Sequence, residues 1–356
     1  MSDIRAASVT IDLAALHHNF SRIKELAPHS KLMPVIKANA YGHGMIRVAR
    51  ALAAADGFAV AQLKEALGLR AAGIDKPLCV FQGFQSLQDL QLIFQHQLRP
   101  AISQLWQINL LEQYKASARI DVWLKVNSGM GRLGVQVDEV DEAWQRLNAL
   151  NCIETVGLMT HYANADVAGH ESNQQQTDNF KQLHQRYSAE SSVSNSAAIV
   201  SQLYPDQDWV RPGIMLYGAS PLQGVSAAEL DLHPVMQVQA TLIAINKLKQ
   251  GQSVGYGNRW VCPEDMPVGI VNIGYGDGYP RQASEQTPLL INQQKSHLIG
   301  RVSMDSIAID LRGINAQCGD SVEIWGTQLA VDEIASHSQT ISYELLCRLG
   351  NQLDIQ

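Results

Sequence analysis

The sequence has few cysteines, and their arrangement gives no sign of a disulfide scaffold or a structural zinc site. The five cysteines in 356 residues are scattered, odd in number and form no CxxC pair. No apolar stretch is long enough to span a membrane, and the start "MSDIRAASVTIDL" has no basic segment followed by an apolar core. We therefore expect a protein of a reducing compartment, the cytoplasm, with no metal centre, membrane segment or signal peptide.

The sequence also lacks an excess of positive charge. Lysine and arginine number 27 against 34 aspartates and glutamates, the net charge is -7, and no long run carries one sign. This balance argues against a general nucleic-acid-binding protein. An apolar content of 46% and a charged content of 17% are typical of a packed globular enzyme. The length allows two domains, or one barrel with an appendage.

Short apolar runs alternate with helical patterns such as "MIRVARALAAA" (45–55) and "VDEAWQRLNAL" (140–150). The eight strand candidates are "LMPVIK" (32–37), "GFAVA" (57–61), "PLCVF" (77–81), "LRPAI" (98–102), "IDVWLKV" (120–126), "IETVGLMTH" (153–161), "SSVSN" (191–195) and "IMLYG" (214–218). Alternation of strands and helices predicts a parallel sheet, and eight such units match an α/β fold of the (β/α)8 TIM-like barrel type over residues 10–230.

The pattern changes near Leu232. The runs that follow are strand-like and broken by Gly, Asn, Asp and Pro, as in "VMQVQATLIAINKL" (235–248) and "DSVEIWG" (320–326). They predict a mostly β domain over residues 231–356. The segment "ASVTIDL" (7–13) begins one more strand before the barrel. We assign the strand of residues 1–9 to this β domain and expect it to pair there.

In a (β/α)8 barrel the active site lies at the carboxyl ends of the strands. Polar residues at the predicted strand ends come from different strands, as such a site requires. They are Lys37, Lys125, His161, Asn195, Ser196 and Arg211.

Lys37 follows directly on the apolar run that begins at Leu32. Lysine is among the residues least often buried. Either Lys37 ends a strand as an ion-paired or snorkelling side chain, or it is held in a closed site for covalent chemistry.

The segment "GMGRLG" (129–134) matches the GxGxxG dinucleotide fingerprint. In that fingerprint the helix begins within the glycines, whereas here "VQVDEV" intervenes and Asp138 is expected to cap the helix that follows. The dinucleotide interpretation is therefore disfavoured. Lys125 and Arg132 flank the loop, which suggests a small anion as ligand, and a plain turn is the alternative.

Nine motifs, in order along nearly the whole chain, resemble those of the alanine racemase family. They are "VIKANAYGHG" (35–44), "KVNSGMGRLG" (125–134), "MTHYANAD" (159–166), "NSAA" (195–198), "RPGIMLYG" (211–218), "VGYGNRW" (254–260), "GYGDGYPR" (274–281), "GRVSMD" (300–305) and "SYELLC" (342–347). The resemblance implies a pyridoxal 5'-phosphate enzyme that acts on a small amino acid. It also implies a barrel followed by a β domain, and a head-to-tail homodimer.

By resemblance, Lys37 binds the cofactor aldehyde as an imine, which delocalises the carbanion formed when the substrate loses its α-proton. The freed Lys37 amine is then a base on one face of the substrate. Tyr256 of the other subunit is the matching base on the opposite face. His161 and Arg211 match the network that favours its phenolate. Arg211 also matches the residue that pairs with the ring nitrogen, and an arginine supplies no proton there.

The resemblance also implies the remaining contacts of cofactor and substrate. The cofactor contacts are Tyr41, Arg132, His161, Asn195, Ser196, Arg211, Gly213, Ile214 and Tyr343. The substrate contacts are Arg132, Met304, Asp305 and Tyr275, the last three in the family's second subunit. Lys125 matches a lysine that many family members carry as a carbamate, an anion that orients the neighbouring arginine.

Plainer interpretations of single residues stay open on sequence alone. Tyr256 fits an interface or core aromatic, His161 a hydrogen-bonded histidine at a strand end, Arg211 an ion pair, and Asn195 with Ser196 an ordinary helix cap. An unmodified Lys125 paired with a carboxylate is a further alternative.

The sequence is compatible with more than one function. The main hypothesis is an alanine racemase that supplies D-alanine for peptidoglycan or interconverts alanine in catabolism. The alternatives are a broad-spectrum or non-alanine racemase, a fold-related amino-acid decarboxylase, and a non-catalytic cofactor carrier. "RPGIMLYG" argues against the decarboxylases, which pair the ring nitrogen with an acid, and the β domain argues against the shorter carriers.

The chain departs from the family pattern at a few positions. Gly276 stands where alanine is common, Asn127 stands where aspartate is frequent, and the ending "RLGNQLDIQ" lacks the basic and aromatic residues of many relatives. His43, between two glycines, has no assigned role beyond a hydrogen bond within its turn.

Overall fold

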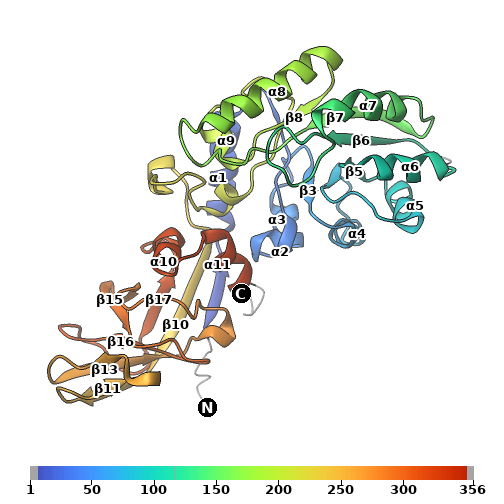
Figure 1. Ribbon diagram of the computed structural model, residues 1–356. Helices are drawn as coiled ribbons and strands as arrows, with labels where there is room; N and C mark the ends of the chain where they lie inside the picture. Colours follow the sequence, from blue (N-terminus) through green and yellow to red (C-terminus); the bar gives the residue numbers. More distant parts are fainter. Residues whose placement is uncertain (1–6, 117, 351–356) are drawn as a thin grey trace.

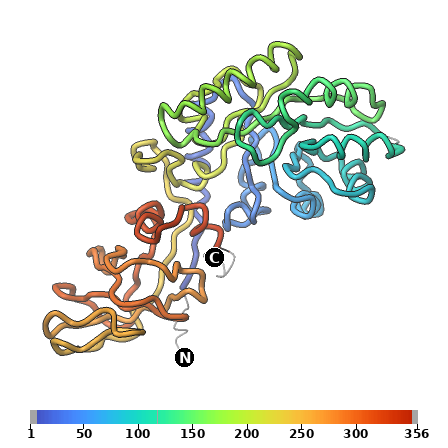
Figure 2. Tube along the Cα trace, viewed as in Figure 1, coloured from blue at the N-terminus to red at the C-terminus, as the bar shows by residue number. Residues whose placement is uncertain are grey.

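The structure, a computed structural model, describes residues 7–116 and 118–350. Figure 1 shows a barrel of strands and helices, coloured blue to yellow-green, and a β domain at the lower left, coloured mostly yellow to red. In the trace of Figure 2 the blue N-terminal segment runs through the β domain before it enters the barrel. None of the described helices has the length and apolar character needed to cross a membrane.

The barrel is a single parallel sheet, which within the described residues has eight strands in the order β2-β9-β8-β7-β6-β5-β4-β3. The strands are β2 Lys31–Leu32, β3 Phe58–Val60, β4 Leu78–Val80, β5 Arg99–Ile102, β6 Ile120–Lys125, β7 Ile153–Met159, β8 Ser191–Ser192 and β9 Trp209–Val210. The helices are α1 Leu13–Leu26, α2 Lys37–Tyr41, α3 Met45–Ala51, α4 Leu63–Ala71, α5 Leu87–Gln95, α6 Leu105–Gln113, α7 Val140–Asn148, α8 Glu171–Tyr187 and α9 Ser196–Val200. The predicted (β/α)8 architecture is confirmed.

The barrel closes between the segment after β2 and strand β3. A parallel bridge joins Val35 to Ala59. The Ile36 N–H donates to the Ala59 carbonyl at 2.9 Å, and the Ala59 N–H donates to the Pro34 carbonyl at 2.9 Å. Strands β3 and β4 are buried along their whole length, as expected of parallel strands covered by helices. Closure brings the carboxyl ends of strands that are distant in sequence into one ring.

The prediction of a strand at "IMLYG" is wrong. Ile214–Tyr217 forms a 3-10 helix, η2, and the eighth strand is Trp209–Val210 just upstream. Pro212 has no N–H to continue the ladder, and Gly213 turns the chain with φ -122° and ψ -96°. Every residue of η2 is buried, so the apolar run carries no period that would distinguish a strand from a helix.

The β domain is built around the long strand β10. Its sheet has the order β1-β10-β13-β16-β15-β14-β17, and β17 also pairs with β10. The strands are β1 Ser8–Ile11, β10 Met236–Leu248, β13 Met266–Val271, β14 Pro288–Ile291, β15 Gln294–Ile299, β16 Ile307–Asp310 and β17 Ser321–Trp325, with a separate pair β11 Ser253–Val254 and β12 Trp260–Val261. Two helices follow, α10 Val331–His337 and α11 Ser342–Leu349. The shorter 3-10 helices are η1 Val137–Glu139, η3 Ala228–Leu230, η4 Tyr256–Asn258 and η5 Tyr275–Asp277.

The N-terminal strand β1 lies in the β domain, although the helix after it belongs to the barrel. β1 pairs antiparallel with β10, with Ser8 opposite Gln239 and Ile11 opposite Met236. The Asp12 carboxylate then caps α1 by accepting from the Ala14 N–H at 2.8 Å. The proposed domain limits, 10–230 and 231–356 with the strand of 1–9, remain predictions, and residues 1–6 and 351–356 lie outside the described residues.

Asn19 on α1 ties the barrel to the segment that enters β10. Its side-chain amide donates to the carbonyls of Leu216 at 3.0 Å and His233 at 2.8 Å. Its carbonyl oxygen accepts from the His233 N–H at 2.8 Å. Asn19 is fully buried, so these backbone groups depend on it for their hydrogen bonds.

Asn19→Ala is expected to lower the free energy of unfolding by about 2–4 kcal/mol, because it leaves several buried backbone groups without partners. The measurement is the urea midpoint of the purified protein. Asn148→Ala is the matched control, since the exposed Asn148 makes one local bond to the Trp144 carbonyl. Equal midpoints for the two variants would contradict the role given to Asn19.

Candidate active site

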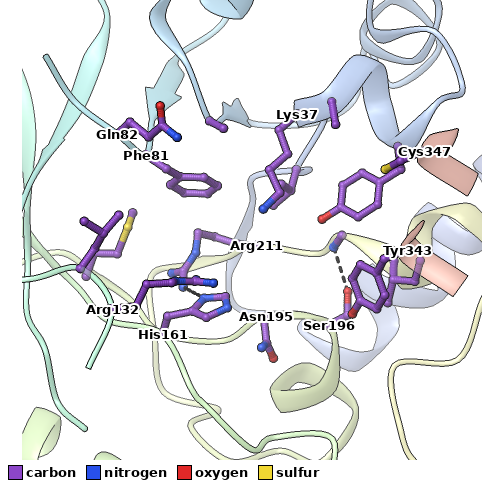
Figure 3. A pocket seen from close by; sticks show the side chains of 18 of the residues that line it. Lys37, Phe81, Gln82, Arg132, His161, Asn195, Ser196, Arg211, Tyr343 and Cys347 are labelled. Carbon is purple, nitrogen blue, oxygen red and sulfur yellow. Dashed lines mark hydrogen bonds between the residues drawn. The ribbon is translucent and has the colours of Figure 1, made fainter. Parts of the chain in front are cut away.

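A cavity of about 570 Å³ opens at the carboxyl ends of the barrel strands, a size typical of small-molecule sites. Its walls come from the last residues of β6 and β7 and from the segments that follow β2, β3, β4, β6, β7, β8 and β9. Helix α11 of the C-terminal part closes one side. Figure 3 shows Lys37 above Arg211 and His161, with Ser196 and Tyr343 to one side. The barrel therefore places the cavity where the sequence predicted an active site.

Most of the predicted site residues meet in this cavity. Those that line it are Lys37, Tyr41, Lys125, Arg132, His161, Asn195, Ser196, Arg211, Gly213, Ile214 and Tyr343. Residues that sequence reasoning missed also line it, namely Val35, Ala38, Ala61, Phe81, Gln82, Leu133, Met159 and Cys347. Gln82 and Met159 lie at strand ends, so the strand-end rule was the signal that would have found them. No signal of that kind marked Cys347, which lies on α11.

The cavity concentrates positive charge. Lys37, Lys125, Arg132 and Arg211 line it, and none of the described lining residues is Asp or Glu. Burial, followed by the nearby Arg132, lowers the pKa of Lys37. Burial, followed by the charges of Arg211 and Arg132, lowers the pKa of Lys125 to about 8. Four cationic side chains without a carboxylate indicate a site for anionic ligands.

The buried Arg211 lines the cavity, and several hydrogen-bond acceptors hold its guanidinium. Its guanidinium donates to Ser192 Oγ and to the Thr160 carbonyl, both at 2.6 Å. It also donates to the Nδ1 of His161 at 3.3 Å. Burial, followed by the charge of Arg211, holds the pKa of His161 well below its ordinary value. His161 is therefore neutral, with Nδ1 as an acceptor.

One side of the cavity offers hydroxyl and amide donors. Ser196 Oγ accepts from the Gly213 N–H at 2.8 Å, which leaves the hydroxyl proton free to donate to a ligand. A Cβ at position 213 would lie 2.8 Å from the Tyr41 hydroxyl, so only glycine permits this close approach. The side-chain Oδ1 of Asn195 accepts from the Ala198 N–H at 3.0 Å and caps α9, as its plainer interpretation predicts.

Lys37 begins an unusual turn rather than ending a long strand. The paired part of the predicted strand 32–37 stops at Leu32, apart from the bridge at Val35. Residues 38–41 then adopt left-handed conformations with φ between 51° and 54°. Each such residue costs about 1–2 kcal/mol when it is not glycine, so the surrounding contacts must hold this turn in place.

Neighbouring side chains supply part of that support. The Glu65 carboxylate accepts from the Ala38 N–H at 2.7 Å and from the Gln62 N–H at 2.9 Å. The Asn39 carbonyl oxygen accepts from the Met45 N–H at 2.8 Å. Gly42 packs against α11 so closely that a Cβ would lie 2.3 Å from the Leu346 carbonyl oxygen.

The glycine-rich loop 129–134 is not a dinucleotide site. No helix begins within the glycines, since η1 starts at Val137 and α7 at Val140. The loop is held by Asn127, whose side-chain Oδ1 accepts from the Gly131 N–H at 2.8 Å. It carries Arg132 into the cavity. The expectation that Asp138 caps the following helix is wrong, because the chain enters η1 at Gln136, whose N–H donates to Glu139 at 2.9 Å.

Four predicted site residues lie away from the cavity, on adjoining loops of the β domain. Tyr256, Met304, Tyr275 and Asp305 are all exposed, the first three by 70%, 54% and 37%. The Gly276 N–H donates to the Met304 carbonyl at 2.8 Å. A Cβ on Gly257, next to Tyr256, would lie 3.4 Å from the Arg301 guanidinium. The loops near residues 256, 275 and 304 therefore form one exposed face.

Outside the cavity, one group of side chains could offer ligands to a metal ion. It consists of His18, Asp231 and His233. The two imidazole rings stack face to face, with centroids 3.8 Å apart and an interplanar angle of 1°. Lone pairs in parallel ring planes do not converge on one point, so we assign no metal to this group.

Comparison with known proteins gives full-length matches. The model of the family "Alanine racemase, N-terminal domain" matches residues 11–221, and that of "Alanine racemase, C-terminal domain" matches residues 235–356. The chain is 46% identical to an alanine racemase of Nitrosococcus oceani (96% of this chain, 97% of the relative) and 44% identical to a catabolic alanine racemase of Pseudomonas putida (97% of each). Its structure superimposes on a biosynthetic alanine racemase from Pseudomonas aeruginosa with a TM-score of 0.96, at 39% identity and 99% coverage of both chains.

The lowered pKa of Lys37 is directly measurable. In ligand-free protein whose lysines carry ¹³C-methyl groups, the Lys37 signal should titrate below 10.5, because burial and Arg132 disfavour its charge. The Lys249 signal should titrate above 10.5, because Asp265 hydrogen-bonds to its ammonium group, which makes it an internal control. Lys37→Arg assigns the signal. A Lys37 that titrates together with Lys249 would refute the electrostatic description of the cavity.

Proposed function

The chain belongs to the alanine racemase family and its activity is that family's isomerisation of alanine, and from this premise we propose how its own residues carry out the reaction. Alanine racemases depend on pyridoxal 5'-phosphate. We assign the cofactor to the cavity, attached to Lys37. Lys37 and Tyr256 of the partner subunit exchange the α-proton on opposite faces of the substrate. The observation that carries this proposal is the cationic cavity around a lysine of lowered pKa.

The residues of the cavity fit the cofactor. A phosphate dianion needs hydroxyl and amide donors. The hydroxyl residues Ser196, Tyr41 and Tyr343 line the cavity together with Gly213 and Ile214, and the Gly213 N–H orients the Ser196 hydroxyl. The Arg211 guanidinium, which lines the same cavity, would pair with the ring nitrogen of the cofactor. The bound cofactor delocalises the negative charge left on the substrate when the α-proton departs.

Lys37 has the properties of a group that binds an aldehyde and later accepts a proton. Its lowered pKa keeps a larger neutral fraction near neutral pH than an exposed lysine has. The neutral amine is both the nucleophile and the base. The left-handed turn after Lys37 fixes the direction from which its side chain enters the cavity.

Arg211 favours racemisation over the alternative of a decarboxylase. Its guanidinium can donate a hydrogen bond to a ring nitrogen but keeps its own proton and charge. Because Arg211 would leave the ring nitrogen unprotonated, the cofactor would withdraw less charge from the substrate, which would favour the prompt return of a proton to the α-carbon. The hydrogen bonds to Ser192, Thr160 and His161 hold the guanidinium in this position.

The second base is assigned to another copy of the chain. Tyr256 is exposed in the single subunit and lies on the face formed with the loops near residues 275 and 304. A head-to-tail dimer would bring this face over the cavity of the partner. Met304, Asp305 and Tyr275 would then line the substrate side of that cavity, opposite Arg132.

Arg132 and Lys125 are assigned to the substrate carboxylate. Both line the cavity near Lys37. A carbamate on Lys125 would convert one of the cations into an anion and orient the Arg132 guanidinium. The pKa of about 8 supports this modification, because only the neutral amine reacts with carbon dioxide.

Mixing two inactive variants tests whether the site is shared between subunits. Lys37→Ala and Tyr256→Phe should each be nearly inactive with L-alanine. After mixing and exchange of subunits, each hybrid dimer has one cavity with both residues intact, so roughly a quarter of wild-type activity should return. Activity that stays at the level of the separate variants would refute the shared site. Mixing Lys37→Ala with Lys37→Arg is the control that should restore nothing.

The carbamate is testable by ¹³C NMR in the presence of ¹³CO2. A carbamate signal should appear in the wild-type protein and increase as the pH rises through about 8 at constant CO2 pressure, since deprotonation of Lys125 supplies the reactive amine. The signal should be absent from Lys125→Arg and present in the surface variant Lys249→Arg. If the wild-type protein gave no carbamate signal, the assignment of a carbamate to Lys125 would be overturned, and other groups would have to orient Arg132.

A further inference from the structure

His43 lies directly after the left-handed turn and is fully buried. Its Nδ1 is 2.9 Å from the Ala40 carbonyl oxygen and 3.0 Å from the Tyr41 carbonyl oxygen. Both acceptors belong to residues with left-handed backbone, at φ 54° and 51°. One side-chain nitrogen thus bonds to two carbonyls of the strained segment.

The protonation state of His43 follows from these partners. Carbonyl oxygens only accept, so Nδ1 carries the proton. Nε2 is buried and has no hydrogen-bond partner among the described residues, so a second proton there would bury an unpaired charge. Burial accordingly lowers the pKa of His43 to about 4. The side chain is a neutral donor at physiological pH.

The ring of His43 also reaches the second segment that lines the cavity. It stacks on Tyr217, with centroids 4.4 Å apart. Tyr217 ends η2, whose first residue Ile214 lines the cavity, and its hydroxyl donates to the Val35 carbonyl at 2.9 Å. Tyr217 packs on Tyr41 as well, at 4.9 Å between centroids. His43 therefore connects the turn after Lys37 with the segment that carries Gly213 and Ile214.

We propose that His43 is a positioning residue, whose neutral Nδ1–H holds the left-handed turn so that Lys37 and Tyr41 face Gly213 and Ile214 across the cavity. The proposal rests on the proposed function for its consequence, which is correct attachment of the cofactor. Its structural part stands on the hydrogen bonds and the stacking alone. Other donors at position 43 are acceptable only when they reach the same two carbonyls.

His43→Asn and His43→Leu form a matched pair, because asparagine and leucine have nearly the same shape and asparagine alone keeps an N–H donor at the δ position. The first readout is hydrogen exchange of the peptide that covers residues 37–46 in the full-length, cofactor-free protein. His43→Leu should exchange these amides about tenfold faster or more, and His43→Asn should stay within about threefold of the wild type. His184→Leu is the control, since His184 bonds to the Tyr204 hydroxyl far from the turn and should leave this peptide unchanged.

The second readout is the affinity for pyridoxal 5'-phosphate, together with the fraction of Lys37 that borohydride reduction traps on the cofactor. Both should fall about tenfold or more in His43→Leu and recover in His43→Asn. Equal behaviour of the two variants in both readouts would overturn the role of the Nδ1–H. Wild-type protein that bound no cofactor would refute the proposed function, whereas the hydrogen-exchange result would still decide the role of His43.

Discussion

The structure depends on positive charge that gathers at one cavity whose described lining residues include no carboxylate. Lys37, Lys125, Arg132 and Arg211 line one cavity that contains no described carboxylate, and burial lowers the pKa of both lysines. Such an arrangement is unfavourable until anions enter it. Burial, reinforced by repulsion among these cations, lowers the pKa of His161 and of Lys37. In the proposed function, the same positive charge attracts the cofactor phosphate and the substrate carboxylate. Binding and reactivity thus have a common electrostatic origin.

The barrel and the left-handed turn determine where these charged side chains lie. Closure at Val35 and Ala59 places the strand ends in one ring, and the turn at residues 38–41 aims Lys37 into it. The turn is strained, and hydrogen bonds of the Glu65, Asn39 and His43 side chains stabilise it. Gly42 packs closely against α11, the helix that carries Tyr343 to the cavity. The β domain therefore takes part in the site of its own subunit through α11.

The sequence predicted the architecture well where periodicity and strand-end chemistry are strong. Lys37, Lys125 and His161 follow recognisable strands and were found from their positions. The strand at "IMLYG" was wrong because a run buried on every side carries no period. The left-handed turn could not be predicted, since Ala38 and Ala40 give no local reason for positive φ and only tertiary contacts impose it. Tyr256 had no signal of its own. Its assignment depends on the family resemblance and on a second subunit.

Racemisation of L-alanine in D2O tests the two-base account most directly. The wild-type protein should convert L-alanine to D-alanine, and the first D-alanine formed should carry deuterium at the α-carbon while the remaining L-alanine is still protiated. That result follows if one base removes the proton and a different, solvent-equilibrated base returns another on the opposite face. First-formed D-alanine that retains the substrate proton would contradict the account, because a single group would then have carried the proton from one face to the other.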